Sequence, residues 1–231
     1  MRKSNRSTRG NAQSNVKLQD PSTISKSANR SHSATRDGAS NSLLGVVVSS
    51  IISLDEQLSN KLFISSGKDI GFLSGSLIRK FLLWCEYSGH EILWFMLISL
   101  SLWLYRHDPV SLSFNLNLAI AFVLDIIIVV CLKMLFQRRR PEANKIDMYV
   151  LASVDHYSFP SGHASRITAL ACILLHHPVL HNGYKIYVLA WVIIVSLSRT
   201  LAGRHFLGDV LCGNLIGLLE HYFTQSFLWI S

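Results

Sequence analysis

Long apolar runs separated by short polar segments constrain the fold of this chain more than any other feature. Residues 116–136 form an apolar run about as long as a bilayer crossing, with Asp125 and Lys133 as its charged residues. Mean hydropathy is +0.31, which is high for a soluble protein. The pattern predicts an all-α, multi-span membrane bundle, with further spans over residues 92–105, 161–175, 184–201 and 206–230.

The first 42 residues differ sharply in composition from the rest. They are rich in Ser, Asn, Arg and Thr, so they have too little apolar surface to offset the entropy of ordering, and residues 1–42 are predicted to be a disordered basic tail. Residues 43–231 are then the membrane-embedded domain. Eight Lys or Arg against two Asp in residues 1–40 carry +6 of the net charge of +8, without aromatic residues between them, so no nucleic-acid partner is expected.

Residues 43–64 leave the topology open. An apolar first half and a polar second half indicate an amphipathic helix, which would either lie on the membrane surface or cross it. The basic tail favours a cytoplasmic N-terminus. If the helix lies on the surface, the polar clusters described below face the cytosol, and this is the arrangement we expect.

The cysteines and Asp125 do not suggest a metal site. The four cysteines are widely spaced and show no metal-type spacing, so neither a metal nor another cofactor is expected; they are Cys85, Cys131, Cys172 and Cys212. Asp125 is costly inside an apolar helix. We interpret it as a polar contact to a neighbouring helix in preference to a catalytic group.

Polar residues gather at the ends of the apolar runs. Because one crossing separates each pair of polar ends, all of them are predicted to fall on one face of the membrane. They are Lys133 and Arg140 after one run, Ser161 and His163 at the start of the next, Arg199 at the end of the third, and His205 and Asp209 at the start of the last.

The residue types in these clusters suit an anion such as phosphate. Arginine side chains are permanently charged forks, and Ser161-Gly162 follows Pro160 at an expected helix start, where free backbone N–H groups favour an anion. Asp209 lies four residues after His205. If His205 begins a helix, the carboxylate can accept a hydrogen bond from one ring nitrogen and leave the other free as a nucleophile.

The order and spacing of the clusters are Lys133-x6-Arg140-Pro141, Pro160-Ser161-Gly162-His163 and Ser198-Arg199-x5-His205-x3-Asp209. This three-part pattern resembles the type 2 phosphatidic acid phosphatase superfamily of integral-membrane lipid phosphatases. The resemblance implies that His205 attacks phosphorus to form a phosphohistidine, that Asp209 orients His205, and that His163 protonates the leaving oxygen. It further implies phosphate-binding roles for Lys133, Arg140, Ser161, Gly162 and Arg199, without a metal ion.

A finer resemblance involves the connection between the first two clusters. Arg138–Pro141, then Asp147-Met148, then Ser153–Asp155 leading into YSFPSGH are similar to the presqualene diphosphate, or polyisoprenoid diphosphate, phosphatase branch. That branch implies presqualene, farnesyl and geranylgeranyl diphosphate as substrates, and the endoplasmic reticulum and nuclear envelope as location. Arg138, Arg139 and Arg204 would either serve a diphosphate or anchor the chain at lipid headgroups.

Three alternatives stay open at this point. One is a broad lipid phosphate phosphatase acting on phosphatidate, lysophosphatidate or sphingosine phosphate. Another is a different enzyme of the superfamily, of the glucose-6-phosphatase or dolichyl diphosphatase type. The third is a non-catalytic membrane scaffold that binds partners through its tail. A homo-oligomer is compatible with each of them.

Overall fold

The structure is a computed structural model that describes residues 43–63, 75–143, 156–176 and 182–230. The tail predicted over residues 1–42 lies outside the described residues. The chain divides into two compact units, residues 1–51 and 52–231. The described residues of the first unit form the beginning of α2, an amphipathic helix as the sequence predicts, with bounds Leu43–Leu62.

The second unit is built of α-helices, and its described residues contain a single isolated β-bridge, between Arg139 and Tyr157. The sequence prediction of an all-α bundle is therefore confirmed. Its helices run in the order α3 (Gly75–Ser88), α4 (Glu91–Leu104), α5 (Pro109–Phe136), α6 (Gly162–His176), α7 (Asn182–Leu201), α8 (Leu207–Phe223) and the short π-helix η2 (Thr224–Leu228).

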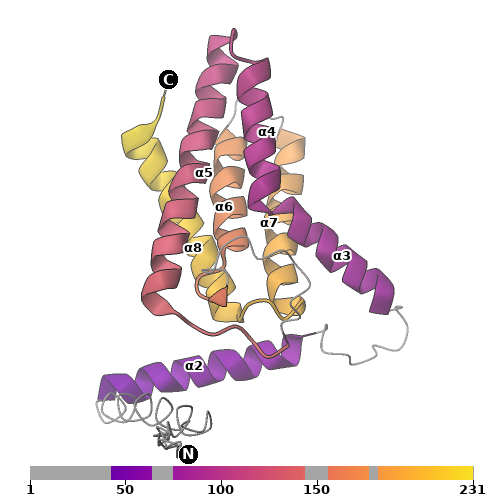
Figure 1. Ribbon diagram of the computed structural model, residues 1–231, viewed down its shortest axis with the longest axis vertical. Helices are drawn as coiled ribbons and strands as arrows, with labels where there is room; N and C mark the ends of the chain where they lie inside the picture. Colours follow the sequence, from indigo (N-terminus) through magenta and orange to yellow (C-terminus); the bar gives the residue numbers. More distant parts are fainter. Residues whose placement is uncertain (1–42, 64–74, 144–155, 177–181, 231) are drawn as a thin grey trace, which may run out of the picture. The chain divides into compact units, whose positions relative to one another are not determined.

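Helix α6 is the centre of this bundle. It packs against α5, α7 and α8 (Figure 1), and most of its residues are buried. The closest approach is made by α8, where a Cβ added to Gly213 would lie 2.6 Å from the carbonyl oxygen of Ser161. A Cβ added to Gly217 would lie 2.3 Å from that of Ser165. The two glycines therefore let α8 lie directly against the backbone of α6.

Among the residues that the structure describes, two helices are long and apolar enough to cross a membrane, namely α5 and α7. The apolar α4 is shorter, at 14 residues. The predicted spans over 161–175 and 206–230 correspond to α6, with 15 residues, and α8, with 17. A bilayer crossing takes about 20 residues, so these two predicted spans are shorter than expected.

The helices differ from the sequence prediction in three ways. First, helix α3 was not predicted at all. Helix α5 begins before residue 116, because the Asp108 carboxylate accepts a hydrogen bond from the Ser111 N–H at 3.1 Å and Pro109 occupies the first turn. The run 206–230 is not one helix, since α8 ends at Phe223 and a π-helix follows.

The charged residue inside α5 contacts a neighbouring helix, as interpreted from the sequence. Asp125 is fully buried and accepts a hydrogen bond from the hydroxyl of Ser165 on α6. Arg166 Nε lies 3.2 Å from its carboxylate, and the same guanidinium is 3.2 Å from Glu91 at the start of α4. The pairing neutralises a charge that would be costly to bury alone.

Candidate active site

The polar ends of helices α5 to α8 come together at one end of the bundle. Ser161 N–H donates to the main-chain oxygen of Asp209 at 3.0 Å, which joins the start of α6 to the first turn of α8. Lys133, Arg140 and Arg199 all lie close enough to His205 to act on the charge of its ring. The structure therefore brings together the residues that the sequence places in three separate clusters.

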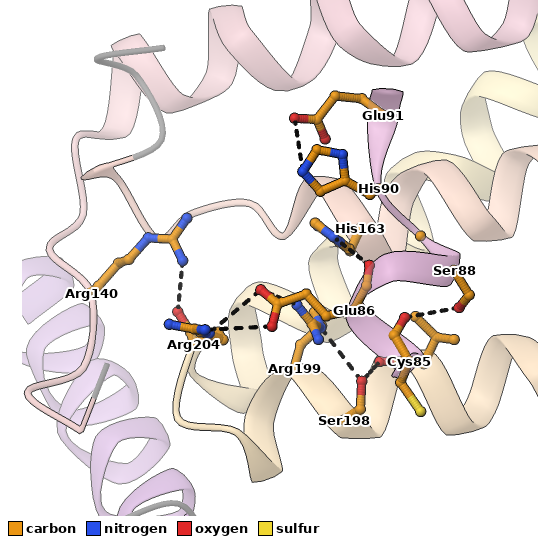
Figure 2. Close-up of polar contacts among 12 residues, drawn as sticks. Cys85, Glu86, Ser88, His90, Glu91, Arg140, His163, Ser198, Arg199 and Arg204 are labelled. Carbon is orange, nitrogen blue, oxygen red and sulfur yellow. Dashed lines mark hydrogen bonds and ion pairs between the residues drawn. The ribbon is translucent and has the colours of Figure 1, made fainter. Parts of the chain in front are cut away.

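Arg199 closes α7 and is buried, with 1% of its surface exposed. Its Nη1 lies 3.1 Å from Oε1 of Glu86 on α3, which also lies 3.5 Å from Arg204 Nε (Figure 2). The second terminal nitrogen of Arg199 has no hydrogen-bond partner among the described residues. A buried guanidinium with one free donor is suited to bind an additional anion.

The start of α6 has the form expected for an anion site. Ser161 precedes the helix, and its main-chain oxygen accepts the first helical hydrogen bond, from Ser165 N–H at 3.1 Å. Its hydroxyl is buried and is unpartnered within the described ranges. Gly162 lies against α5, where an added Cβ would come within 3.2 Å of Val129. The tight packing and the helix N-terminus both favour the small residue.

His205 lies two residues before α8, so it does not begin that helix. Its Nδ1 is 2.7 Å from the main-chain oxygen of Ser158, and a carbonyl can only accept. Nδ1 therefore carries the proton, and Nε2 keeps its lone pair. The Asp209 carboxylate is 4.0 Å from Nδ1, which is too long for a hydrogen bond.

This geometry corrects the expected pairing of His205 with Asp209. The carboxylate instead accepts hydrogen bonds from the Ser158 hydroxyl, from Phe206 N–H at 3.0 Å and from Arg138 at 2.7 Å. Asp209 thus reaches the histidine indirectly, by holding Ser158, whose carbonyl fixes the ring. The sequence identifies the carboxylate, but the side chain that connects it to His205 is not recognisable from spacing.

His163 lies on the first turn of α6, in the same site as His205. Its Nε2 is 3.2 Å from the main-chain oxygen of Glu86 (Figure 2), and its ring meets that of His90 edge-on, with centroids 6.1 Å apart. It is within Coulombic reach of both Arg199 and His205. A second imidazole therefore lies beside the same arginine and faces the same group of charges.

The electrostatic environment keeps His205 neutral. Burial lowers the pKa of its imidazole well below the ordinary value of 6.5, and the positive charges of Arg140, Lys133 and Arg199 lower it further. The hydrogen bond to Ser158 opposes this effect. The neutral ring is the form that has a lone pair to give to an electrophile.

The three arginines that the sequence offers beside the motifs, Arg138, Arg139 and Arg204, differ in their surroundings. Arg138 is held by two carboxylates, at 2.8 Å from Asp55 and 2.7 Å from Asp209, and lies over the ring of Phe206. It is thus engaged in supporting the site. Arg204 pairs with Glu86, and its main-chain oxygen accepts a bond from Arg140 at 3.4 Å (Figure 2), whereas Arg139 is exposed.

Sequence reasoning missed Glu86 and Ser158. Glu86 is an acidic residue within the apolar stretch FLLWCEY, and an ionisable residue in such surroundings is a signal of a paired or functional group. Ser158 had no comparable signal, because its contribution depends on a main-chain carbonyl.

The combined arrangement suits transfer of a phosphoryl group. Three cations and a helix N-terminus lie around a neutral, oriented imidazole, and a second imidazole lies nearby; the cations are Lys133, Arg140 and Arg199. Such positioning and charge stabilisation supply most of the rate in phosphoryl transfer. Over the described ranges, no group of three or more His, Cys, Asp or Glu residues is placed to hold a metal ion.

A family profile and curated proteins similar to this chain agree on one family of phosphatases. The profile described as the PAP2 superfamily matches residues 114–230. The chain is 32% identical over 154 residues to the probable lipid phosphate phosphatase beta of Arabidopsis thaliana, covering 52% of this chain and 72% of that protein. It is 30% identical over 121 residues to the phosphatidylglycerophosphatase B of Bacillus subtilis, covering 49% of this chain and 57% of that protein.

The fold is also similar to that of a solved structure. A crystal structure of a transmembrane PAP2 type phosphatidylglycerolphosphate phosphatase from Bacillus subtilis matches with a TM-score of 0.61. The match covers 84% of this chain and 90% of that chain, at 20% sequence identity. Identity at this level supports a shared fold of membrane helices and carries no information on substrate.

Proposed function

The chain belongs to the PAP2 superfamily, and on that premise we propose that it is a lipid phosphate phosphatase whose preferred substrates are polyisoprenoid diphosphates and monophosphates. Membership of the family makes it a membrane-bound phosphoric monoester hydrolase. The observation that carries the proposal is the meeting of Lys133, Arg140 and Arg199 around the neutral ring of His205.

In the first step, the lone pair of His205 Nε2 attacks phosphorus, and the bond from phosphorus to the leaving oxygen breaks. His163 acts here as the imidazolium, the form that a bound anion favours. It keeps the Nε2 proton that faces the Glu86 carbonyl and gives its Nδ1 proton to the leaving oxygen, so a monophosphate releases an alcohol and a diphosphate releases a prenyl phosphate. Arg199, Lys133 and Arg140 stabilise the charge on the phosphoryl oxygens, together with the Ser161 hydroxyl and the N–H groups at Gly162.

In the second step, water attacks the phosphohistidine. His163, now without its proton, accepts one from the water, and the bond between phosphorus and Nε2 breaks. The electron pair returns to Nε2, inorganic phosphate leaves, and both histidines recover their starting protonation. Asp209 contributes by holding Ser158, whose carbonyl keeps the Nδ1 proton in place throughout.

The substrate class rests on two supports. The triple-arginine segment at Arg138–Pro141 and the YSFPSGH stretch are similar to the polyisoprenoid branch. A diphosphate also carries more charge than a monoester, which suits a site where three cations meet. The second candidate is a broader lipid phosphate phosphatase, favoured by the names of the plant and bacterial relatives. The resemblance further suggests the endoplasmic reticulum and nuclear envelope. The cytosolic face is proposed on a different ground, from the basic tail and from residues 43–64 taken as a helix on the membrane surface.

The test is a substrate panel with purified protein in detergent, with and without a chelator. We expect release of phosphate from farnesyl and geranylgeranyl diphosphate to exceed that from phosphatidate, and to persist in the chelator. His205→Ala should abolish it, while His107→Ala, in an exposed turn between α4 and α5, should not change it. Faster turnover of phosphatidate would favour the broader enzyme. Full activity of His205→Ala would refute the mechanism and leave the scaffold hypothesis.

A further inference from the structure

Glu86 is the one acidic side chain that the described residues place directly on Arg199. It is buried, with 5% of its surface exposed, and it bridges Arg199 and Arg204 (Figure 2). Buried guanidinium groups need a counter-ion, and this carboxylate supplies it. The phosphoryl oxygens of a substrate would compete for the same donors.

The main chain beside Glu86 is held firmly. Its carbonyl oxygen contacts His163 Nε2, and three residues later the Gly89 carbonyl accepts a bond from Arg166 at 3.1 Å. Gly89 packs so closely that an added Cβ would lie 3.0 Å from the His163 ring. Because this backbone is fixed between helices, the carboxylate can leave Arg199 only by rotation of its own side chain.

Two donors of the same site are left unpaired by this arrangement. One terminal nitrogen of Arg199 and the hydroxyl of Ser161 are buried and, within the described ranges, have no hydrogen-bond partner. Glu86 therefore satisfies the arginines in part, and it leaves buried donors that a tetrahedral oxyanion could satisfy.

We propose that Glu86 is a resident counter-ion that exchanges with phosphate on Arg199, opposing anion entry and promoting release of inorganic phosphate after hydrolysis. The inference rests on the proposed function for its catalytic consequence, and on the Glu86–Arg199 pair alone for its binding consequence. Glu86 is in this sense a positioning residue, because it acts on phosphate through the arginines.

The test compares Glu86→Gln with Glu142→Gln, which removes an equal charge from an exposed residue beyond α5. The probe is inorganic phosphate, titrated calorimetrically into the full-length protein in detergent. We expect Glu86→Gln to bind phosphate at least tenfold more tightly than the unmodified protein, and Glu142→Gln to bind it equally. In turnover, Glu86→Gln should lower both KM and kcat and should be inhibited more strongly by phosphate.

The outcomes separate the two hypotheses. Unchanged or weaker phosphate binding by Glu86→Gln, in a protein whose unmodified form hydrolyses lipid phosphates, overturns the counter-ion role and leaves the enzyme assignment intact. Tighter binding in a protein that hydrolyses none of the panel supports the counter-ion role and removes the proposed function. If Glu86→Gln unfolds in chloride, phosphate at equal ionic strength should restore its folding, because an anion replaces the lost partner of Arg199. If phosphate does not restore the folding of Glu86→Gln, the proposal is also overturned.

Discussion

At the scale of single residues, the environment of His205 explains how a histidine can act as a nucleophile among so many cations. Ser158 holds the proton on Nδ1 through its carbonyl, and its hydroxyl is in turn held by Asp209. Arg138, itself paired with Asp55, binds the Asp209 carboxylate, so this carboxylate is already engaged by a cation. Burial and the positive charges nearby therefore keep the ring neutral.

The first prediction concerns pH. Burial, Arg140, Lys133 and Arg199 all lower the pKa of His205, so the neutral ring persists below pH 6.5 and is lost only as the pH falls through the lowered value. We expect the acidic limb of the kcat/KM profile to lie below pH 6.5. Arg140→Gln should reduce the rate and also move this limb toward higher pH, because one of the charges that oppose protonation is gone.

The matched control is Arg106→Gln, in the exposed turn before α5. It should leave the limb in place. An acidic limb above pH 6.5 in the unmodified enzyme, or one that Arg140→Gln does not move, would contradict the account of His205.

The sequence was sufficient to predict the motif residues of the site, but not how they contact one another. The eight residues named from the motifs gather at one end of the bundle, because motif spacing and alternating crossings dictate that placement. The network between them was not predictable. Asp209 contacts Ser158 rather than His205, and Arg138 binds carboxylates rather than a diphosphate or lipid headgroups, since these choices depend on loop geometry that spacing does not encode.

At the scale of elements, α6 shows why hydropathy alone gives an incomplete reading. It carries Ser165, Arg166 and Thr168, yet it is the most enclosed helix of the bundle. Surrounded by α5, α7 and α8, it exposes little to lipid, and its polar groups pair with neighbours such as Asp125 and Asn214. Helix α3 escaped prediction because its lysine, arginine and glutamate interrupt the apolar pattern.

The second prediction tests the contact between α6 and α8. An added methyl group at Gly217 would lie 2.3 Å from the Ser165 carbonyl oxygen, and main-chain atoms cannot rotate away. Gly217→Ala should therefore push α8 from α6 and destabilise the protein by about 1–3 kcal/mol. Thermal unfolding in detergent would report a lower Tm. Leu215→Ala, an exposed position on the same helix, should change the Tm little. Equal Tm values for Gly217→Ala and the unmodified protein would show that the helices are less tightly packed.

At the scale of the whole molecule, apolar side chains cover the outward faces of the described helices. Leu135 on α5 is 73% exposed, and Ile193 on α7 and Leu215 on α8 are similarly placed. A water-soluble protein rarely exposes so many large apolar side chains along its helices, and these faces are suited to contact with lipid. The family assignment and the surface therefore agree on a membrane protein.

The third prediction follows from this surface. In membranes from cells that express the protein, alkaline carbonate should leave it in the pellet, because helices that contact lipid are not released by loss of electrostatic attraction. A detergent should bring it into solution. Release by carbonate alone would mean that the chain is held at the surface, and that α5 and α7 do not cross the bilayer.

The gathering of the motif residues at one end of the bundle has a consequence for how the enzyme would meet its substrate. A lipid whose head reaches that end keeps its hydrocarbon tail among the acyl chains of the leaflet. Enzyme and substrate therefore meet by lateral diffusion in the plane of the membrane. The relevant concentration is then the mole fraction of substrate among the surrounding amphiphiles. Adding inert detergent at constant total substrate should slow the reaction by dilution of the surface.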